Sequence, residues 1–234
     1  MGDLVERDGI YYKKFTPTPF TGKIIGREQG RLKNGKKEGE WFSYWKNGQL
    51  FNKENYKNGK KEGEWVHYHD NGRLFTKENY KNGKQEGEWV SYHDNGKLLQ
   101  KISFKNGEKE GKWFSYYDNG KLEGKGSYKN GKREGDWVSY HDNGKLWSKE
   151  NYKNGKRDGE EVTYWENGQL ESKGSWKNGE PEGDWVNYHS NGQLHRKGNY
   201  KNGKWEGKWV TYHDNGNVYK EYSGTYKNDK RVSD

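Results

Sequence analysis

The 234-residue sequence contains no cysteine, a single methionine and three prolines. Without cysteine the chain can form no disulfide and supply no thiolate, so a reducing compartment suits it. No apolar run approaches the ~20 residues that a membrane-spanning helix needs. The first residues also lack the basic and apolar segments of a signal peptide. We therefore expect a cytoplasmic protein.

Apolar residues are scarce: hydrophobic residues make up 26% of the sequence and charged residues 34%, and the mean hydropathy is -1.62. Such values are typical of disordered chains, which cannot bury enough apolar surface to offset their conformational entropy. Aromatic residues nevertheless reach 16%, with 12 Trp and 19 Tyr, and each ring buries a large area. A polar chain with regularly spaced rings suits a thin sheet without a thick core.

The aromatic residues recur at a step of 24 residues, which indicates a tandem repeat. Tyrosine keeps this step through eight copies, and so does a glycine five residues before it. Tryptophan keeps it in seven copies, at Trp41, Trp65, Trp89, Trp113, Trp137, Trp185 and Trp209. Glu161 stands at the missing tryptophan position, which we interpret as drift in a tolerant repeat.

Each repeat contains two Asn-Gly pairs, such as Asn58-Gly59 and Asn71-Gly72. Asn-Gly is the strongest short-range hairpin signal, because type I′ turns need positive φ at both central residues. The spacing of the pairs leaves room for strands but not for helices. We therefore predict an all-β fold, an elongated, single-layer, twisted antiparallel meander of 24-residue β-hairpin repeats. The predicted parts are an N-terminal cap, eight repeats, and a C-terminal cap with a tail: residues 1–31, 32–221 and 222–234.

Two-residue loops at the Asn-Gly pairs would fix the strand register. The loop at Asn71-Gly72 predicts four cross-strand pairs: Gly63 with Tyr80, Trp65 with Glu78, Val66 with Lys77, and Tyr68 with Phe75. The loop at Asn82-Gly83 predicts two more: Lys77 with Glu88, and Phe75 with Val90. In the first pair the tyrosine ring would lie over the glycine, which alone leaves room for it. Trp65 and Tyr68 are three residues apart, so rings are expected on both faces unless a bulge intervenes.

The repeat unit resembles a known family. Its pattern of Tyr-Lys-Asn-Gly, Glu-Gly-x-Trp-x-x-Tyr and Asn-Gly-x-Leu, clear from Tyr56 to Asn79, is similar to the MORN repeat variant. Bacterial proteins built from this variant are commonly labelled YwqK-family antitoxins, and the segments Leu4–Gly9 and Pro19–Gly22 resemble that family's usual opening. The resemblance implies an elongated meander that binds other molecules, in some members a toxin encoded nearby. Relatives with MORN repeats are also linked to membrane lipids and to cytoskeletal scaffolds.

No constellation of residues predicts a metal, cofactor or catalytic site. Five histidines share one repeat position, but equivalent positions lie two strands apart, about 9.5 Å, which is too far for one zinc ion. The Asp-Asn-Gly stretches fit turns better than calcium loops, which need alternating oxygen ligands and a terminal Glu. Repeated serines such as Ser91 lie in mid-strand without a strained nucleophile elbow. We therefore predict no metal, no cofactor, no catalytic residues and no enzymatic activity.

The net charge of +9 leaves electrostatic partners open. Lysines recur at one repeat position, at Lys53, Lys77, Lys101, Lys125, Lys149, Lys173 and Lys197. Acids recur at another, at Glu38, Glu62, Glu86, Glu110, Glu134, Asp158, Glu182 and Glu206. The cationic excess is spread evenly, so cross-strand pairing and solubility are the simplest interpretation. Binding to anionic lipid, acidic proteins or nucleic acid is the alternative.

Two positions vary among otherwise uniform repeats. One has Phe51, Phe75, Leu99, Glu123, Trp147, Glu171, His195 and Tyr219; the other has Trp45, His69, His93, Tyr117, His141, Trp165, His189 and His213. Packing positions should be uniform, whereas a surface that recognises one partner need not be, and exposed aromatics are typical interface anchors. Our hypothesis is that Trp45, Phe51, Phe75, Trp147 and Trp165 bind a partner; neutral drift at exposed positions is the alternative.

Taken together, these features predict a non-enzymatic protein-binding repeat module. It resembles an antitoxin or immunity protein that covers a partner protein, and the resemblance implies a toxin as that partner. A membrane-surface or scaffold protein that binds anionic lipid or acidic partners is an alternative, and a nucleic-acid binder is a second one. The sequence leaves the oligomeric state open.

Overall fold

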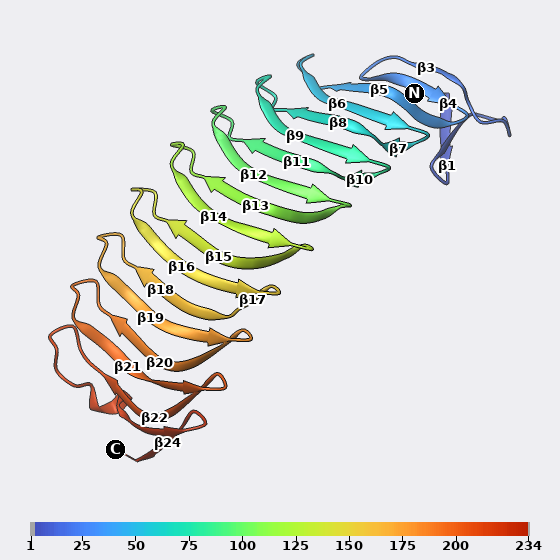
Figure 1. The fold of residues 1–234 in the computed structure, drawn as a ribbon. Helices are drawn as coiled ribbons and strands as arrows, with labels where there is room; N and C mark the ends of the chain where they lie inside the picture. Colours follow the sequence, from blue (N-terminus) through green and yellow to red (C-terminus); the bar gives the residue numbers. More distant parts are fainter. Residues whose placement is uncertain (1–2, 234) are drawn as a thin grey trace. The chain divides into compact units, whose positions relative to one another are not determined.

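The computed structural model describes residues 3–233, in which the regular secondary structure is β-strand apart from one short 3₁₀ turn (Figure 1). The chain divides into two units, described separately below. Unit 1 comprises residues 1–111 and 118–120, and unit 2 comprises residues 112–117 and 121–234. Within the described residues, no helix is long and apolar enough to span a bilayer.

The strands of unit 1 begin with a separate two-stranded sheet, β1–β2, and continue as a series of hairpins. They are β1 (Leu4–Arg7), β2 (Ile10–Lys13), β3 (Gly22–Ile24), β4 (Glu28–Lys33), β5 (Lys36–Tyr44), β6 (Leu50–Lys57), β7 (Lys60–Lys61), β8 (Gly63–Tyr68), β9 (Leu74–Lys81), β10 (Lys84–Gln85), β11 (Gly87–Tyr92) and β12 (Leu98–Lys105). The boundary between the units lies within β13 (Glu108–Tyr116).

The strands of unit 2 also form successive hairpins. A short 3₁₀ turn, η1 (Lys220–Tyr222), precedes the last two strands. The strands of this unit are β14 (Leu122–Lys129), β15 (Lys132–Tyr140), β16 (Leu146–Lys153), β17 (Lys156–Arg157), β18 (Gly159–Tyr164), β19 (Leu170–Lys177), β20 (Glu180–Tyr188), β21 (Leu194–Lys201), β22 (Lys204–Thr211), β23 (Gly224–Lys227) and β24 (Lys230–Ser233).

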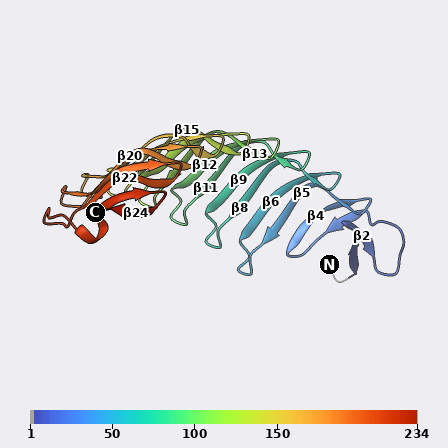
Figure 2. The ribbon, with the colours of Figure 1, turned by 90° about the horizontal axis from the view of Figure 1, so that it is seen from below.

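Strands that follow one another in sequence pair antiparallel in both units, as in β5–β6 and β20–β21. The predicted all-β meander of repeating hairpins is therefore confirmed. Figure 2 shows strands β4 to β12 side by side in one layer. The assigned limits of the caps and of the repeat region stay predictions.

One of the two Asn-Gly pairs in each repeat forms the predicted turn. Asn58 and Gly59 have φ values of 51° and 77°, both positive as a type I′ turn requires. The same conformation recurs at Asn82, Asn106, Asn130, Asn154, Asn178 and Asn202. We call these the tight turns.

The other Asn-Gly pair lies in a longer loop, so the prediction of a two-residue turn there is wrong. In the loop of residues 45–49, the Gly48 N–H donates to the Trp45 carbonyl at 3.0 Å and the Trp45 N–H to the Gln49 carbonyl at 2.8 Å. Gly48 has φ 85° but Asn47 is not left-handed. The Asn47 side chain instead accepts the Gln49 N–H at 3.0 Å. This is a type I turn followed by a left-handed residue.

The register across the longer loops is nevertheless nearly as predicted. Gly63 pairs with Tyr80, Trp65 with Glu78 and Val66 with Lys77, as expected, but Tyr68 pairs with Leu74 rather than Phe75. The longer loop displaces the register by one residue, and a bulge at Phe75 restores the predicted register. Two opposite offsets therefore preserve the predicted faces.

The register after each tight turn shifts by two residues at a second bulge. Beyond Asn82-Gly83, Gln85 pairs with Tyr80 as a simple hairpin requires. Lys77 then pairs with Val90 instead of the predicted Glu88, and Phe75 has no partner at Val90. The cause is Gly87, whose φ of 82° interrupts the strand. Glycine is required there for its backbone conformation.

Substitution of Gly87 tests this bulge. A Cβ at Gly87 would meet no atom within 4 Å, so only the left-handed backbone opposes a side chain. We expect Gly87→Ala to lower the free energy of unfolding by about 1–2 kcal/mol. Gly87→Asn should cost clearly less, because asparagine tolerates this conformation. Urea denaturation followed by tryptophan fluorescence measures both, and equal losses would contradict the backbone explanation.

Candidate functional site

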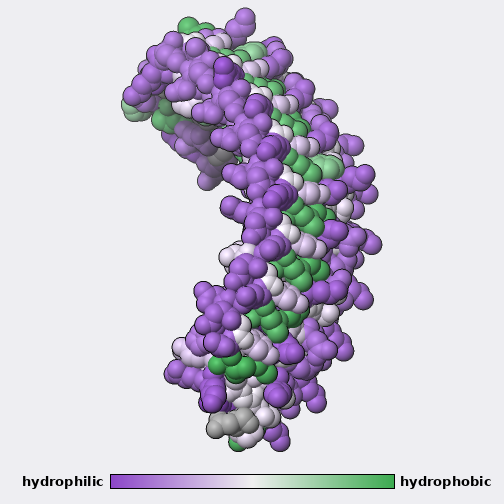
Figure 3. All heavy atoms as spheres, turned by 90° about the vertical axis from the view of Figure 1, so that its left-hand side faces the viewer, coloured by the Kyte–Doolittle hydropathy of each residue, from purple (hydrophilic) through white to green (hydrophobic). Residues whose placement is uncertain are grey.

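The sheet presents two different faces. Residues two apart on a strand share a face, and the Trp65 and His67 rings indeed lie 6.2 Å apart. We call this side the tryptophan face. Val66 and Lys77 pair on the opposite side, the lysine face. Figure 3 shows a row of hydrophobic side chains along the hairpins, bordered by hydrophilic ones.

The tryptophan face buries its rings without a second layer. Trp65 is only 3% exposed. Its ring centroid lies 5.1 Å from that of Tyr56 and 5.3 Å from that of Tyr80. The Lys61 ammonium lies 3.9 Å above the same ring. Tyrosines on both sides and a cation above therefore take the place of a second layer.

Unit 2 repeats this arrangement at Trp137. The ring lies 5.1 Å from Tyr128 and 5.9 Å from Tyr152, with the Arg133 guanidinium 4.3 Å above it. It also lies flat over Gly126, where an added Cβ would be 2.4 Å from the indole. Aromatic rings thus do cover strand glycines, but tryptophans cover them. The predicted cover of Gly63 by Tyr80 is wrong, because a Cβ there would meet Asn55 instead.

The repeat that lacks tryptophan builds an ionic cluster instead. Glu161 is 8% exposed and accepts a hydrogen bond from the Trp176 indole N–H. One Arg157 nitrogen lies 3.7 Å from Glu161, and another lies 3.0 Å from Glu150. Tyr152 donates its hydroxyl to Glu150 at 2.7 Å. Burial raises the pKa of Glu161 above its ordinary value, against the opposing effects of Trp176 and Arg157. The residue is a buried, bonded acid.

Lysines of the lysine face form ion pairs at four repeats. The pairs, with N–O distances of 2.8, 2.6, 2.5 and 2.7 Å, are Lys53–Glu40, Lys77–Glu64, Lys101–Glu88 and Lys173–Glu160. The recurring acids that the sequence suggested as cross-strand partners have another role. Glu38 accepts the N–H of Asn58 at 2.7 Å, in the adjacent tight turn. An asparagine N–H of the adjacent tight turn donates in the same way to Glu62, Glu86, Glu134, Asp158 and Glu182.

The two variable positions lie together at the opposite end of the hairpins. We call this region the longer-loop edge: it comprises the five-residue loops and the two residues after each, as in residues 45–51, 69–75, 141–147 and 165–171. Trp45 contacts Phe51 with ring centroids 4.3 Å apart, and His69 contacts Phe75 at 4.8 Å. In unit 2, His141 lies 6.1 Å from Trp147.

The first variable position holds the bulge residue of the strand. Ser43 pairs with Asn52 and Tyr44 with Leu50, so Phe51 has no cross-strand partner. Phe75 and Trp147 occupy the same place and are 42% and 48% exposed. A bulge redirects its side chain out of the regular pairing. This position can therefore vary without loss of a pair.

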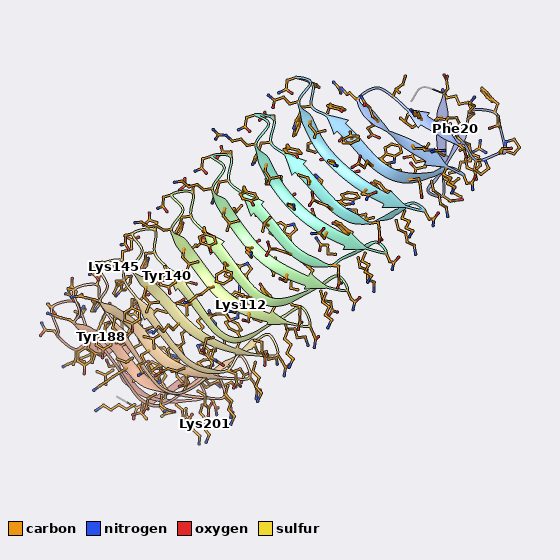
Figure 4. All side chains as sticks on the ribbon, turned by 45° about the horizontal axis from the view of Figure 1, so that its top comes forward. Phe20, Lys112, Tyr140, Lys145, Tyr188 and Lys201 are labelled. Carbon is orange, nitrogen blue, oxygen red and sulfur yellow. The ribbon has the colours of Figure 1, made fainter. Side chains whose placement is uncertain are left out.

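The second variable position is constrained to hydrogen-bond donors. The Trp45 indole N–H donates to the Tyr68 carbonyl of the next hairpin at 3.2 Å, and the Tyr117 hydroxyl donates to Tyr140 at 2.7 Å. Equivalent bonds join His141 to Tyr164, Trp165 to Tyr188 and His189 to Tyr212. Tyr140 and Tyr188 lie at this end of unit 2, and Lys201 at the other (Figure 4). Because a carbonyl only accepts, each histidine must donate from a protonated ring nitrogen.

Two of the five hypothesised binding residues meet in one groove. Trp147 and Trp165 line an open groove of about 600 Å³ in unit 2, together with Glu171, Glu166 and His141. Trp45 and Phe51 contact each other in unit 1, and Phe75 lies in the same edge. The assignment of these residues to partner binding stays a prediction. Glu166 and Glu171 were not among the binding residues predicted from the sequence. A signal for them was present, because residues 157–180 contain six acidic and three basic residues.

Comparison with known proteins gives one strong match. The family model described as MORN repeat variant matches eight segments: residues 37–58, 61–82, 85–106, 109–130, 133–154, 157–178, 181–202 and 205–228. No curated protein matches the sequence. The matched segments together span more than half of the chain.

Two solved structures are distantly similar. The crystal structure of TcdB2-TccC3 has 13% sequence identity and a TM-score of 0.21, and the match covers 79% of this chain and 13% of that one. A porin-like protein from Bacteroides uniformis ATCC 8492 has 8% identity and a TM-score of 0.21, with 91% and 90% covered. At such TM-scores neither likeness bears on fold or function.

Removal of one donor at the longer-loop edge tests its structural role. We expect Tyr117→Phe to lower the free energy of unfolding by ~1 kcal/mol, because the Tyr140 carbonyl loses its partner. Tyr117→Trp, which restores a ring N–H as at Trp45, should recover part of the loss. Urea denaturation gives both values. If phenylalanine is fully tolerated, the restriction to donor residues has another cause.

The Glu161 cluster predicts a dependence of stability on pH. Because burial raises the folded-state pKa of Glu161, the folded protein holds its proton more tightly than the unfolded chain. The resulting stabilisation is present below the ordinary value of 4.5 and is lost as pH rises through the raised pKa. We expect Glu161→Gln to flatten this part of the curve of unfolding free energy against pH. Parallel curves for the two proteins would contradict the prediction.

Proposed function

The chain belongs to the MORN repeat variant family, and from this premise we propose that it is a non-enzymatic protein-binding module whose longer-loop edge contacts the partner. The observation that carries the proposal is the exposure of large rings at the bulge position. Trp147 and Phe75 are 48% and 42% exposed, whereas four tryptophans of the tryptophan face are at most 5% exposed: Trp41, Trp65, Trp137 and Trp209. Exposed aromatics at fixed spacing are typical anchors of protein interfaces.

The absence of enzymatic activity is part of the proposal. Acids and serines recur in copy after copy, whereas a catalytic constellation is a single arrangement. Glu161, the acid at the position of the missing tryptophan, is held by Trp176 and Arg157 within the sheet. Its bonds fit a structural role.

We propose further that the partner is a toxin, which the chain would neutralise in the cytoplasm by covering its surface. The support for this step is the resemblance of the repeat to that of YwqK-family antitoxins. A series of hairpins with exposed rings suits inhibition by coverage, because it needs no chemistry of its own.

The ion pairs of the lysine face favour this proposal over an electrostatic partner on that face. Binding to phosphates or anionic lipids needs unpaired cations in a continuous track. Four lysines of the lysine face are instead paired with carboxylates at 2.5–2.8 Å. Membrane-surface and nucleic-acid binding are therefore outcomes that the experiment distinguishes.

Capture of the partner tests the proposed function. The tagged chain is incubated with nuclease-treated lysate of its source organism, washed at low and high salt, and analysed by mass spectrometry. We expect one protein near 1:1 stoichiometry that resists high salt, since an aromatic interface depends little on ionic strength. Lipid, nucleic acid or a diffuse, salt-labile set of proteins would contradict the proposal. Relief of growth inhibition on co-expression with that protein would identify a toxin.

Variants of the longer-loop edge locate the interface. Phe51, Phe75 and Trp147 are changed to Ala, while Trp45 and Trp165 are changed to His, which keeps the donor. We expect the five changes together to weaken partner binding at least 100-fold, since anchors carry most of the affinity. A control variant changes Lys53, Lys77 and Lys173 to Ala on the lysine face and should bind normally. Unchanged affinity of the five-residue variant would exclude this edge.

A further inference from the structure

One groove of the longer-loop edge differs in chemistry from the rest of the chain. It lies between two hairpins of unit 2 and has a volume of about 600 Å³. Two indoles line it, from Trp147 at a bulge and from Trp165 in the next loop. Glu166 and Glu171 line it as well, and Glu171 is half-buried. Aromatic faces and carboxylates therefore share one open concavity.

The indoles are held in place from behind. The Trp165 N–H donates to the Tyr188 carbonyl at 3.1 Å, so the ring edge is bonded and its faces stay free of that bond. His141 donates to the Tyr164 carbonyl at 2.8 Å and contacts Trp147. Trp147 itself is 48% exposed. Rings fixed in this way lose little conformational entropy when a ligand stacks on them.

The charge around the groove is opposite to that of the whole chain. The net charge of the protein is +9, but residues 157–180 contain six acidic and three basic residues. Glu171 is close enough to Glu161 to contribute to the raised pKa of that acid. Arg157 is engaged by Glu150 and Glu161, so it does not neutralise the groove acids Glu166 and Glu171. Lys145 also lies beside the groove, and its ammonium donates to the Asn167 carbonyl at 2.9 Å rather than to a carboxylate. The carboxylates of Glu166 and Glu171 therefore attract a cation to the groove.

We propose that this groove binds an arginine side chain of the partner protein. A guanidinium group is planar, stacks on an indole face and donates paired hydrogen bonds to a carboxylate. Trp147 and Trp165 supply the faces, and the half-buried Glu171 supplies the carboxylate. The inference rests on the proposed function, because it takes the longer-loop edge as the protein-binding surface.

The combination occurs at one place in the repeat series. The equivalents of Trp147, Trp165 and Glu171 in unit 1 are Phe51, His69 and Phe75, which offer neither two indoles nor a carboxylate. The groove is thus a departure from the repeat, as a site for one particular residue of a partner should be. Phe15 provides a control, because its ring is 98% exposed and lies outside the longer-loop edge.

Binding of a capped amino acid to the full chain tests the assignment. The probe is Nα-acetyl-arginine amide, compared with the neutral Nα-acetyl-citrulline amide and with Nα-acetyl-lysine amide. Indole N–H signals in nitrogen-15 NMR spectra report the site, and the signals of Trp147 and Trp165 are assigned from the spectra of Trp147→Phe and Trp165→His. We expect arginine to shift these two signals in a saturable way, and to bind at least tenfold more tightly than citrulline.

The variants separate the site from non-specific attraction. Glu171→Gln and Trp147→Ala should each weaken arginine binding at least fivefold, while Phe15→Ala should leave it unchanged. Equal binding of citrulline, tighter binding of lysine, or an effect of Phe15→Ala as large as that of Trp147→Ala would overturn the assignment.

The outcome is distinct from that of the capture experiment. If a partner is captured but arginine does not bind the groove, the inference fails and the proposed function stands. If arginine binds but no protein is captured, the groove stands and the proposed function fails.

Discussion

A sheet of one layer can bury its rings only against its own neighbours, and the rest of this structure depends on that constraint. Trp65 reaches 3% exposure between two tyrosines and beneath a lysine of adjacent strands. The high share of charged residues is consistent with this arrangement, because long cationic side chains cover the rings with their stems. Where tryptophan is absent, Arg157 and two glutamates occupy the same place with polar bonds. The composition that suggested disorder is thus the composition of a thin ordered sheet.

The sequence predicted the hairpins because Asn-Gly strongly favours the positive φ angles of a type I′ turn. It could not separate the two Asn-Gly pairs, since Asn58 is left-handed and Asn47 is not, although both precede glycine. The difference comes from bonds of the flanking backbone and of the Asn47 side chain. The register survived this error because the bulge cancels the offset of the longer loop. The shift at Gly87 went unpredicted, because the equivalent glycine, Gly63, was interpreted as a space for a ring.

The candidate site was partly visible in the sequence as variation within uniform repeats. Variation alone could not show that Trp45 and its equivalents donate hydrogen bonds. The carbonyl that accepts the Trp45 indole N–H belongs to Tyr68, 23 residues further along the chain. Nor could it show that the other position is a bulge. Glu166 and Glu171 lie in a segment with a local excess of acidic residues, residues 157–180. The even spacing of lysines along the chain drew attention away from this local excess. Trp147 and Glu171 occupy equivalent positions of successive repeats, and only the loop geometry explains how both reach one groove.

The bonds between hairpins recur at constant intervals of sequence within the regular copies: 20 residues from an acid such as Glu38 to a tight turn, and 23 residues from a ring donor such as Trp45 to its carbonyl. A duplication or deletion of one whole copy within a unit therefore re-forms every such bond with an identical neighbour. The chain can therefore lengthen or shorten in steps of 24 residues, because each added copy makes the same contacts as its neighbours. Each added copy also adds one unpaired bulge side chain, so the number of residues that a partner can read grows in direct proportion to the length of the array.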